Sequence, residues 1–298
     1  MLYHVPALLK QSVDGLEIKP GGVYVDVTFG GGGHSAEVLR RMGKGRLIAF
    51  DQDEDALANS IDDKRFTLLN QNFRFLKNNL LYLGIESVDG IIADLGVSFH
   101  QFDVPERGFS FRFEGPLDMR MSRSGSLTAA KVLNEYTEER LADIFYQYGE
   151  ISNSRAVARA VVAARERSPL LMIGDLTAAV AALVPKKIEN KFYAKLFQAL
   201  RIEVNRELEY LKELLIQSLE MLGSGGRLVV ITYHSLEDRL VKNFMKSGSF
   251  GGEIEKDFYG NVITPFSLVT RKAVVVDDAE IAANPRSRSA RLRIAEKI

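Results

Sequence analysis

A run of four glycines, Gly30 to Gly33, constrains this chain more than any other feature. It stands between residues 23–29, an apolar run that predicts a strand, and residues 35–42, which predict a helix. Glycine permits positive φ and lets a ligand approach the backbone, and the first turn of a helix offers free N–H donors. The pattern therefore indicates a ligand-binding loop in an α/β fold.

The alternation of strand and helix continues through the first hundred residues. Residues 46–50, 66–71 and 90–94 predict strands, and residues 53–61 predict a helix, so a parallel sheet is expected. Asp51 follows the second strand, where an acidic side chain can accept both hydroxyls of a ribose. The alternative is a structural turn of glycines with a helix-capping aspartate.

The middle of the chain interrupts this alternation. Residues 97–190 are far longer than a normal strand-to-helix connection, and their helical patterns indicate an inserted domain. One of these patterns begins near Asp175, a candidate N-cap. Residues 1–96 and 191–298 then form the core domain. In its second part, leucines at helical spacing over 196–222 predict one long amphipathic helix. A strand is expected over 227–233, and closing strands that would pair antiparallel are expected over 265–276 and 291–297.

Composition excludes several classes of protein. The 298 residues contain 39 basic and 39 acidic side chains, so a non-specific electrostatic binder of duplex nucleic acid is disfavoured. The sequence has no cysteine, which excludes disulfides and thiolate chemistry and favours the cytoplasm. No apolar run approaches the length of a membrane span. None of the four histidines is paired at the i, i+4 spacing of a helical metal site, so no metal is expected.

Two nucleoside cofactors, NAD and S-adenosylmethionine, suit the predicted fold. NAD is disfavoured because Ser35 occupies the position of the third fingerprint glycine and no second mononucleotide-binding half follows. Asp26, just before the loop, suits a cationic ligand and would repel a pyrophosphate. The alternative for Asp26 is a carboxylate that organises the loop through backbone N–H groups. The residues therefore favour S-adenosylmethionine.

Asp94 ends the fourth strand, at the edge where open α/β sheets bind ligands. In enzymes that methylate exocyclic amines, acceptors at this position hold the amino group while its nitrogen attacks the methyl carbon. We therefore predict a catalytic role for Asp94. The motif Asp-Leu-Gly-Val differs from the Asp/Asn-Pro-Pro-Tyr/Phe common in such enzymes and lacks the aromatic residue that stacks on a base.

Longer motifs make a family resemblance specific. The segments VDVTFGGGGHS, DLGVS…Q, ERGFSF…GPLDMRM, FQALRIEVNREL, GGRLVVITYHSLEDR and NPRSRSARLRIAEK resemble the S-adenosylmethionine-dependent methyltransferases that modify N4 of a decoding-centre cytosine in small-subunit (16S) ribosomal RNA. The resemblance covers nearly the whole chain. It implies a class I (Rossmann-like) methyltransferase sheet with an inserted helical substrate-recognition domain.

The resemblance also implies the cofactor site and the partners. S-adenosylmethionine would be bound by the residues that match the family's motifs: Gly32, Gly33, His34, Asp51, Phe73, Asp94 and Gln101. Where the family usually has Ser-Ser-Pro-Gln, this chain has Ser98-Phe99-His100-Gln101 and lacks the proline. The expected partner is small-subunit ribosomal RNA or the assembled small subunit, and the resemblance suggests a homodimer.

Several cations are candidates for RNA contact. Arg107 and Arg112 alternate with Phe109, Phe111 and Phe113, a composition that stacks bases and binds phosphates, although the phenylalanines also fit one buried face. The other candidates lie after a strand or in the basic tail, and they are His234, Arg286 and Arg288. Two other functions remain open, namely a non-catalytic RNA-binding or ribosome-assembly protein and a methyltransferase that acts on a protein or a small molecule.

Overall fold

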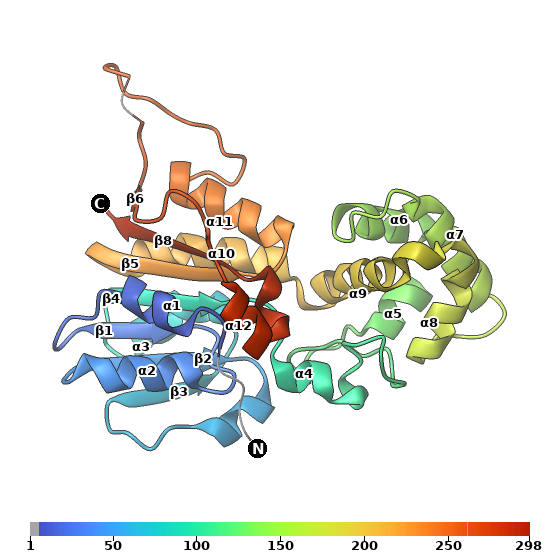
Figure 1. Ribbon diagram of the computed structural model, residues 1–298, viewed down its shortest axis with the longest axis horizontal. Coiled ribbons are helices and arrows are strands. Elements are labelled where there is room, and N and C mark those ends of the chain that lie inside the picture. Colours follow the sequence, from blue (N-terminus) through green and yellow to red (C-terminus); the bar gives the residue numbers. More distant parts are fainter. Residues whose placement is uncertain (1–5, 261) are drawn as a thin grey trace. The chain divides into compact units, whose positions relative to one another are not determined.

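The computed structural model describes residues 6–260 and 262–298, which fall into two compact units (Figure 1). The core unit comprises Met1–Gly96 and Leu208–Ile298, and the inserted unit comprises Val97–Glu207. A core interrupted by one insertion agrees with the sequence pattern. The boundary between the units lies at residue 207, however, and not at residue 190.

The core unit is built on one sheet of eight strands. The strands are β1 (Val23–Asp26), β2 (Arg46–Asp51), β3 (Phe66–Asn70), β4 (Val88–Asp94), β5 (Leu222–Thr232), β6 (Phe266–Leu268), β7 (Val274–Val275) and β8 (Arg291–Lys297). Their order is β3-β2-β1-β4-β5-β8-β6, with β7 also paired to β8. The pairs from β3 to β5 are parallel, and the three pairs made by β8 are antiparallel.

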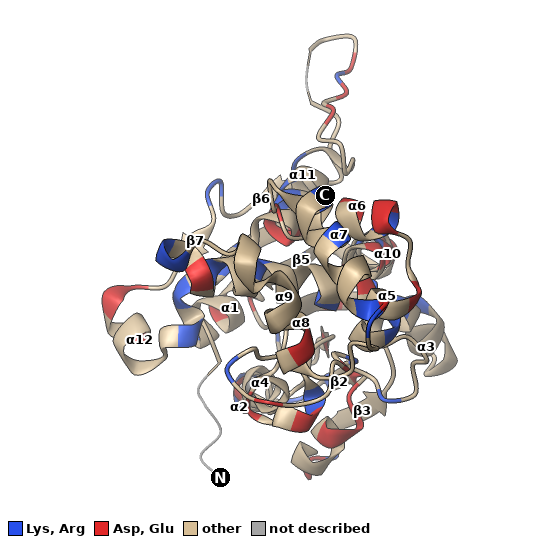
Figure 2. Cartoon of the chain, turned by 90° about the vertical axis from the view of Figure 1, so that its right-hand side faces the viewer, with Lys and Arg blue, Asp and Glu red and all other residues tan. Residues whose placement is uncertain are grey.

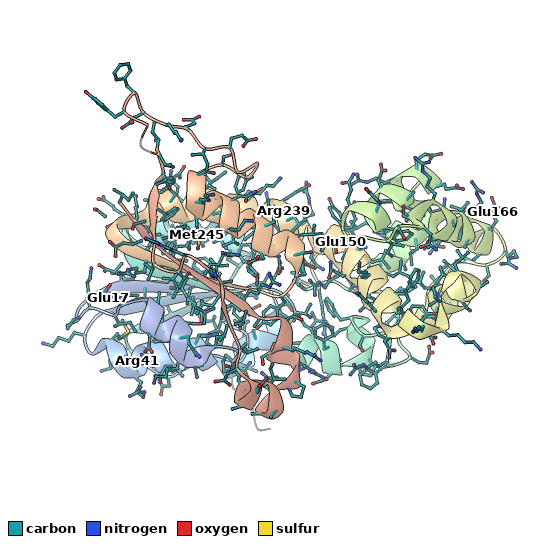
Figure 3. All side chains as sticks on the ribbon, turned by 45° about the horizontal axis from the view of Figure 1, so that its top comes forward. Glu17, Arg41, Glu150, Glu166, Arg239 and Met245 are labelled. Carbon is teal, nitrogen blue, oxygen red and sulfur yellow. The ribbon has the colours of Figure 1, made fainter. Side chains whose placement is uncertain are left out.

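Helices cover both faces of this sheet. They are α1 (Leu9–Gly15), α2 (Gly33–Met42), α3 (Leu76–Tyr82), α10 (Glu207–Met221), α11 (Ser235–Ser247) and α12 (Asp278–Ala283), with short 3-10 turns η1 (Glu54–Asn59), η2 (Phe73–Phe75) and η6 (Pro285–Ser289). The apolar sides of α3, α10 and α11 pack on one face, to which Met245 contributes (Figure 3). The sides of α1 and α2 pack on the other face. The central strands are apolar throughout because both of their faces are buried.

The inserted unit is helical, as predicted. Its elements are α4 (Phe99–Asp103), η3 (Pro105–Arg107), α5 (Ala129–Glu135), α6 (Glu138–Gln147), α7 (Ser154–Arg165), α8 (Ile173–Val180), η4 (Ala181–Leu183), η5 (Lys186–Ile188) and α9 (Glu189–Asn205). One apolar cluster, to which α5 through α9 all contribute, holds the unit together. The helix α9 belongs to this unit because Phe192, Leu196 and Leu200 are buried in that cluster.

The prediction of one long helix over residues 196–222 is wrong. Arg206, with φ of +51°, adopts the left-handed conformation and separates α9 from α10. The side chain of Asn205 holds the end of α9, since its amide donates to the carbonyl of Met119 (2.8 Å) and accepts from the N–H of Met121 (2.7 Å). Leucine periodicity runs through the break, so the pattern could not locate it.

Two local expectations also differ from the structure. The helix expected over 53–61 is the 3-10 turn η1, which Asp53 caps by accepting the N–H of Asp55 (3.2 Å). Asp175 is not the N-cap of α8 but its third residue. Its carboxylate accepts the N–H groups of Leu171 (2.9 Å) and Met172 (2.8 Å). In both places an aspartate does satisfy free N–H donors at a helix start, but the helix begins at a different residue.

In the part of the chain that the structure describes, we find no helix with the length and apolar character needed to cross a membrane.

The core of the sheet gives a first test. Leu228 of β5 is completely buried in the apolar cluster that the sheet forms with α3, α10 and α11. Leu228→Ala should therefore lower the free energy of unfolding by about 2–5 kcal/mol. Urea denaturation measures this change. The matched control is Leu81→Ala on α3, a half-exposed leucine whose loss should cost less than about 1 kcal/mol. Equal losses for the two variants would contradict the packing described above.

Candidate functional site

Three aspartates end three neighbouring parallel strands of the core unit. Asp26 is the last residue of β1, Asp51 of β2 and Asp94 of β4. Because the carboxyl ends of parallel strands meet at one edge of a sheet, their side chains gather there. This edge also carries the glycine loop that leads from β1 into α2.

The glycine loop is shaped by backbone conformations that other residues rarely adopt. Gly30 has φ of +52° and Gly32 has φ of +77°, and the N–H of Gly32 donates to the carbonyl of Phe29 (2.8 Å) to close a tight turn. At Gly33, where α2 begins, a side chain would collide with Pro6, because a Cβ there would lie 2.3 Å from its ring. Glycine is therefore required at these positions for conformational or steric reasons.

Asp51 fastens this loop to the end of β2. Its Oδ2 accepts the N–H of Gly30 (2.7 Å), and its Oδ1 accepts the N–H of Asp53 (2.8 Å). Burial raises the pKa of Asp51 to about 6, although both N–H groups lower it. Each carboxylate oxygen has a second lone pair, so Asp51 can hold the loop and still accept a ribose hydroxyl.

Asp26 makes the contacts of the loop-organising alternative. It is buried, and it accepts the hydroxyl of Ser35 (2.7 Å) and the N–H of Thr28 (3.1 Å). Burial raises the pKa of Asp26 to about 6. Ser35 stands in α2 where an NAD fingerprint would have glycine, and its hydroxyl ties that helix to β1. Asp26 thus acts through the loop more than by touching a ligand.

Asp94 is held from three sides. Its N–H donates to Thr28 Oγ1 (2.6 Å), its Oδ1 accepts the hydroxyl of Tyr233 (2.8 Å), and its Oδ2 lies 3.9 Å from His34 Nδ1. Its side chain keeps 21% of its surface exposed. Burial raises the pKa of Asp94 to about 7, despite the hydrogen bond from Tyr233, which lowers it. The carboxyl group therefore sits near the midpoint of its titration at neutral pH.

Sequence reasoning missed the contact between Tyr233 and Asp94. Tyr233 directly follows β5, the strand that pairs with β4, so the two residues meet at the same sheet edge. The available signal was the pairing of these strands, because the residues that end adjacent parallel strands become neighbours. The hydroxyl of Tyr233 orients the Asp94 carboxylate and stabilises its charge.

His34 carries the strongest indication that this edge binds a ligand. It is 4% exposed, and burial lowers its pKa to about 4, so the ring is neutral at pH 7. Its Nε2 atom is buried and has no hydrogen-bond partner among residues 6–260 and 262–298. A buried polar atom without a partner is costly, so an atom of this kind beside a glycine loop fits a bound ligand.

These features suit S-adenosylmethionine. The turn at Gly32 and the start of α2 let a ligand approach the backbone, and Asp51 offers oxygen acceptors to a ribose. The carboxylate of Asp94 complements a cation, and S-adenosylmethionine is cationic at sulfur and at its amino group. Phe73 lies in η2, just after β3 at the same edge, and is partly buried. Its contact with adenine stays a prediction.

Gln101 lies in the inserted unit and caps a helix there. Its Oε1 accepts the N–H of Ser98 (3.1 Å), while its own N–H donates to Ser98 Oγ (3.2 Å), a reciprocal capping box at the start of α4. The loop without the family's proline is therefore ordered by this cap. The role of Gln101 in cofactor binding stays a prediction.

The candidates for RNA contact have different surroundings. Arg107 is 3% exposed, and its guanidinium donates to the carbonyls of Arg120 (3.0 Å) and Met121 (2.9 Å), so it holds a loop within the inserted unit. Arg112 is exposed. Phe109 is buried, and Phe111 packs on Tyr193 and Phe197, whereas Phe113 is partly exposed. The alternative of one buried phenylalanine face therefore holds for Phe109 and in part for Phe111, but not for Phe113.

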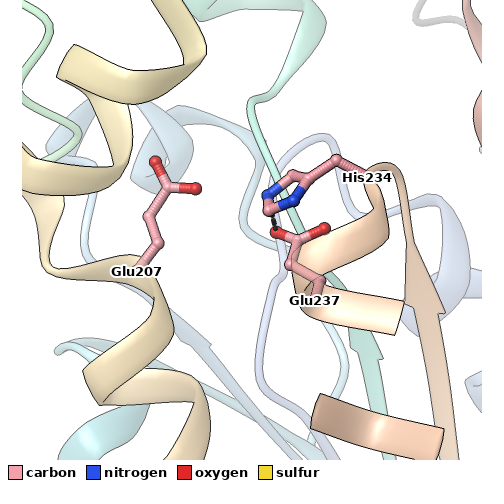
Figure 4. A group of neighbouring side chains, drawn as sticks. All are labelled: Glu207, His234 and Glu237. Atoms are coloured by element: carbon pink, nitrogen blue, oxygen red, sulfur yellow. Dashed lines mark ion pairs between the residues drawn. The ribbon is translucent and has the colours of Figure 1, made fainter. Parts of the chain in front are cut away.

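The remaining candidates belong to the core unit. His234 precedes α11, and its Nε2 lies 3.2 Å from Glu237 Oε1, with both side chains buried (Figure 4). Asp238, on the same helix, accepts a bidentate pair from Arg293. Arg286 and Arg288 are exposed in η6, and Figure 2 colours the Lys and Arg positions of the chain blue, including those near α12. Arg286 and Arg288, like Arg112 and unlike His234, keep the exposure that phosphate contact requires.

The sheet order, the glycine loop and the acidic strand ends define a class I methyltransferase that uses S-adenosylmethionine. The model of the MraW methylase family matches residues 1–298, and the chain belongs to that family. It is 58% identical over 299 residues to "Ribosomal RNA small subunit methyltransferase H" of Flavobacterium johnsoniae, covering 100% of this chain and 99% of that relative. It is 60% identical over 298 residues to the protein of the same name from Bacteroides thetaiotaomicron, covering 100% and 98%.

Cofactor affinity tests the role of Asp51. Asp51→Ala should raise the Kd for S-adenosylmethionine about 5- to 150-fold, because a ribose loses its charged acceptor and Gly30 loses its anchor. Isothermal titration calorimetry measures this affinity. Glu54→Ala, an exposed carboxylate three residues away, serves as the control and should leave the Kd unchanged. An unaltered Kd for Asp51→Ala would refute the assigned role.

The pKa of Asp94 predicts a pH-dependent gain in stability for Asp94→Asn. In the unfolded chain this carboxyl group ionises near pH 4, whereas in the folded protein it ionises near pH 7, so folding becomes less favourable as pH rises between these values. Asparagine carries no charge. Without cofactor, Asp94→Asn should therefore unfold at higher urea than the wild type at pH 8, and the difference should shrink toward pH 4.

Asp143→Asn, which alters an exposed aspartate of α6, is the control for that measurement. It should not reproduce the gain at pH 8. If Asp94→Asn shows the same stability difference at both pH values, the burial of an ionisable Asp94 is not what limits stability.

Proposed function

We propose that this protein transfers a methyl group from S-adenosylmethionine to the N4 amino group of a decoding-centre cytosine in small-subunit ribosomal RNA. Membership of the MraW methylase family over the whole chain supports methyl transfer. The curated relatives, named for the small ribosomal subunit, support the class of RNA. The observation that carries the proposal is the Asp94 carboxylate, aimed by Tyr233 at the edge where the cofactor loop lies.

The chain's own groups suit the chemistry of an exocyclic amine. S-adenosylmethionine, when bound, supplies a methyl group that is activated for displacement at carbon. Asp94 would accept a hydrogen bond from the amino group and so orient its nitrogen toward the methyl group. The methylated nitrogen is cationic and must lose a proton, which the ionised Asp94 carboxylate beside it can accept.

Tyr233 and His34 act through Asp94. The hydroxyl of Tyr233 holds one carboxylate oxygen, which leaves the other to face the substrate. His34 is neutral at pH 7 and therefore does not neutralise Asp94. Burial around these residues excludes water, which strengthens each electrostatic contact.

The target cytosine must reach this edge unpaired. An amino group inside a duplex cannot approach an acceptor at the ends of the strands, so the base has to lie in a loop or be flipped out. Arg112, Arg286 and Arg288 are the exposed cations proposed for phosphate contact, and buried Arg107 is not among them.

The balance of 39 basic and 39 acidic residues limits the number of phosphate contacts. A folded particle is therefore a better substrate than a naked duplex, because shape then contributes to recognition. We accordingly propose the small ribosomal subunit or its RNA as the partner, in the cytoplasm.

Nucleoside analysis tests this function directly. Ribosomal RNA from cells that lack the protein should lose N4-methylated cytidine at one position, and purified protein with labelled S-adenosylmethionine should restore it. An intact modification in the deleted strain would overturn the RNA substrate and favour a protein or a small molecule. Loss of the modification without turnover by the purified protein would favour a non-catalytic assembly role.

Two variants of Asp94 test its part in the reaction. With S-adenosylmethionine saturating, Asp94→Ala should lower the single-turnover rate by a factor on the order of 10²–10³, because an acceptor used in the transition state is lost. Asp94→Asn keeps an oxygen acceptor and should retain more activity. Full rates for both variants would move the acceptor to the turn that contains Tyr233 and His234.

A further inference from the structure

A projecting segment of the core unit joins α11 to β6, and its described residues, 248–260 and 262–265, expose two aromatic rings. Figure 1 shows it extending beyond the end of α11. Phe258 is 97% exposed and Tyr259 is 86% exposed, and their ring centroids lie 5.6 Å apart. The same segment also exposes the side chains of Ile254, Val262 and Ile263. An exposed apolar patch of this kind marks a site of interaction.

The rings are presented by an ordered hairpin turn. Asp257 closes it, because its carbonyl accepts the N–H of Gly260 (3.0 Å) and its Oδ1 accepts the N–H of Tyr259 (2.9 Å). Gly260, the last residue of this turn, has φ of +86°, a left-handed conformation that glycine adopts readily. Below the turn, the N–H of Ile263 donates to the carbonyl of Glu255 (2.9 Å). These bonds close the turn that carries Phe258 and Tyr259.

The base of the segment, in contrast, is part of the core unit. The ring of Phe250 stacks on Phe244 of α11, with centroids 5.0 Å apart, and Asn243 donates to the carbonyl of Phe250 (3.0 Å). The carbonyl of Pro265 accepts the N–H of Ile298 (3.2 Å). These contacts anchor the hairpin without using its tip. The fold therefore does not account for the exposed Phe258 and Tyr259.

The charges around the tip select the kind of partner. Three acidic side chains, Glu253, Glu255 and Asp257, stand against the single basic Lys256. An acidic strip repels the phosphates of RNA and attracts a cationic surface. Aromatic rings at the centre of an interface also contribute much of its binding energy when they fill a pocket.

We propose that the hairpin of residues 248–265 docks on a basic protein surface that offers an apolar socket for Phe258 and Tyr259. The choice of partner rests on the proposed function: the surface belongs to a protein of the small ribosomal subunit, since proteins that pack on RNA carry basic faces. The exposed arginines would then contact RNA, while the hairpin contacts protein. This division explains how a chain with no net charge recognises an RNA-protein particle.

Binding by the full-length protein tests the proposal. The affinity of the double variant Phe258→Ser with Tyr259→Ser is measured for assembled small subunits and for protein-free small-subunit RNA. Tyr82→Ser is the matched control, because Tyr82 is 89% exposed on α3. Glu255→Lys tests the charge, with Glu86→Lys as its control at another exposed glutamate.

The double variant should bind assembled subunits at least tenfold more weakly and bind protein-free RNA like the wild type. Glu255→Lys should weaken binding to subunits in the same direction, and neither control should. An equal loss on protein-free RNA would overturn the proposal in favour of base stacking. A loss of self-association in sedimentation would overturn it in favour of a second copy, and unchanged binding by the double variant would overturn docking altogether.

Turnover is measured separately on the same samples. If the wild type binds assembled subunits through the hairpin but methylates neither subunits nor RNA, the proposed function fails while the docking surface stands. If it methylates its RNA and the hairpin variants bind normally, the docking surface fails while the function stands.

Discussion

The hydrogen bond from the N–H of Gly30 to the Asp51 carboxylate is the contact on which the site depends. It joins the loop after β1 to the end of β2 and so fixes the path of the backbone into α2. Asp26 adds a bond to Ser35 of α2, and Thr28 receives the N–H of Asp94 from β4. Three strand ends and one helix are thereby held as one rigid edge, and rigidity of this kind is what precise positioning of a reacting group requires.

This arrangement is unfavourable for the protein without its cofactor. Burial raises the pKa values of Asp26, Asp51 and Asp94, which means that the folded state resists their ionisation at neutral pH. Shifts of this size gather at functional sites more than elsewhere in proteins. A cationic ligand beside these groups would favour their charged forms, so stability that the buried carboxyl groups cost can return as binding affinity.

Arg107 and Arg112 are close in sequence but have different surroundings in the structure. Arg107 and Arg112 are five residues apart, and sequence alone gives both the character of phosphate ligands. In the structure the Arg107 guanidinium satisfies two backbone carbonyls inside the inserted unit, while Arg112 remains exposed. A buried guanidinium with such partners is a structural group, because moving it outward would leave those carbonyls unpaired.

The sequence by itself determined the parallel sheet, the glycine loop, the insertion and the acidic strand ends, because each depends on local pattern and spacing. Only the tertiary structure decided the break at Arg206, where Asn205 is held by a loop more than eighty residues earlier in the chain. It alone also joined Tyr233 to Asp94, 139 residues apart. Contacts of this range leave no trace in local periodicity, since they form only when distant strands pair.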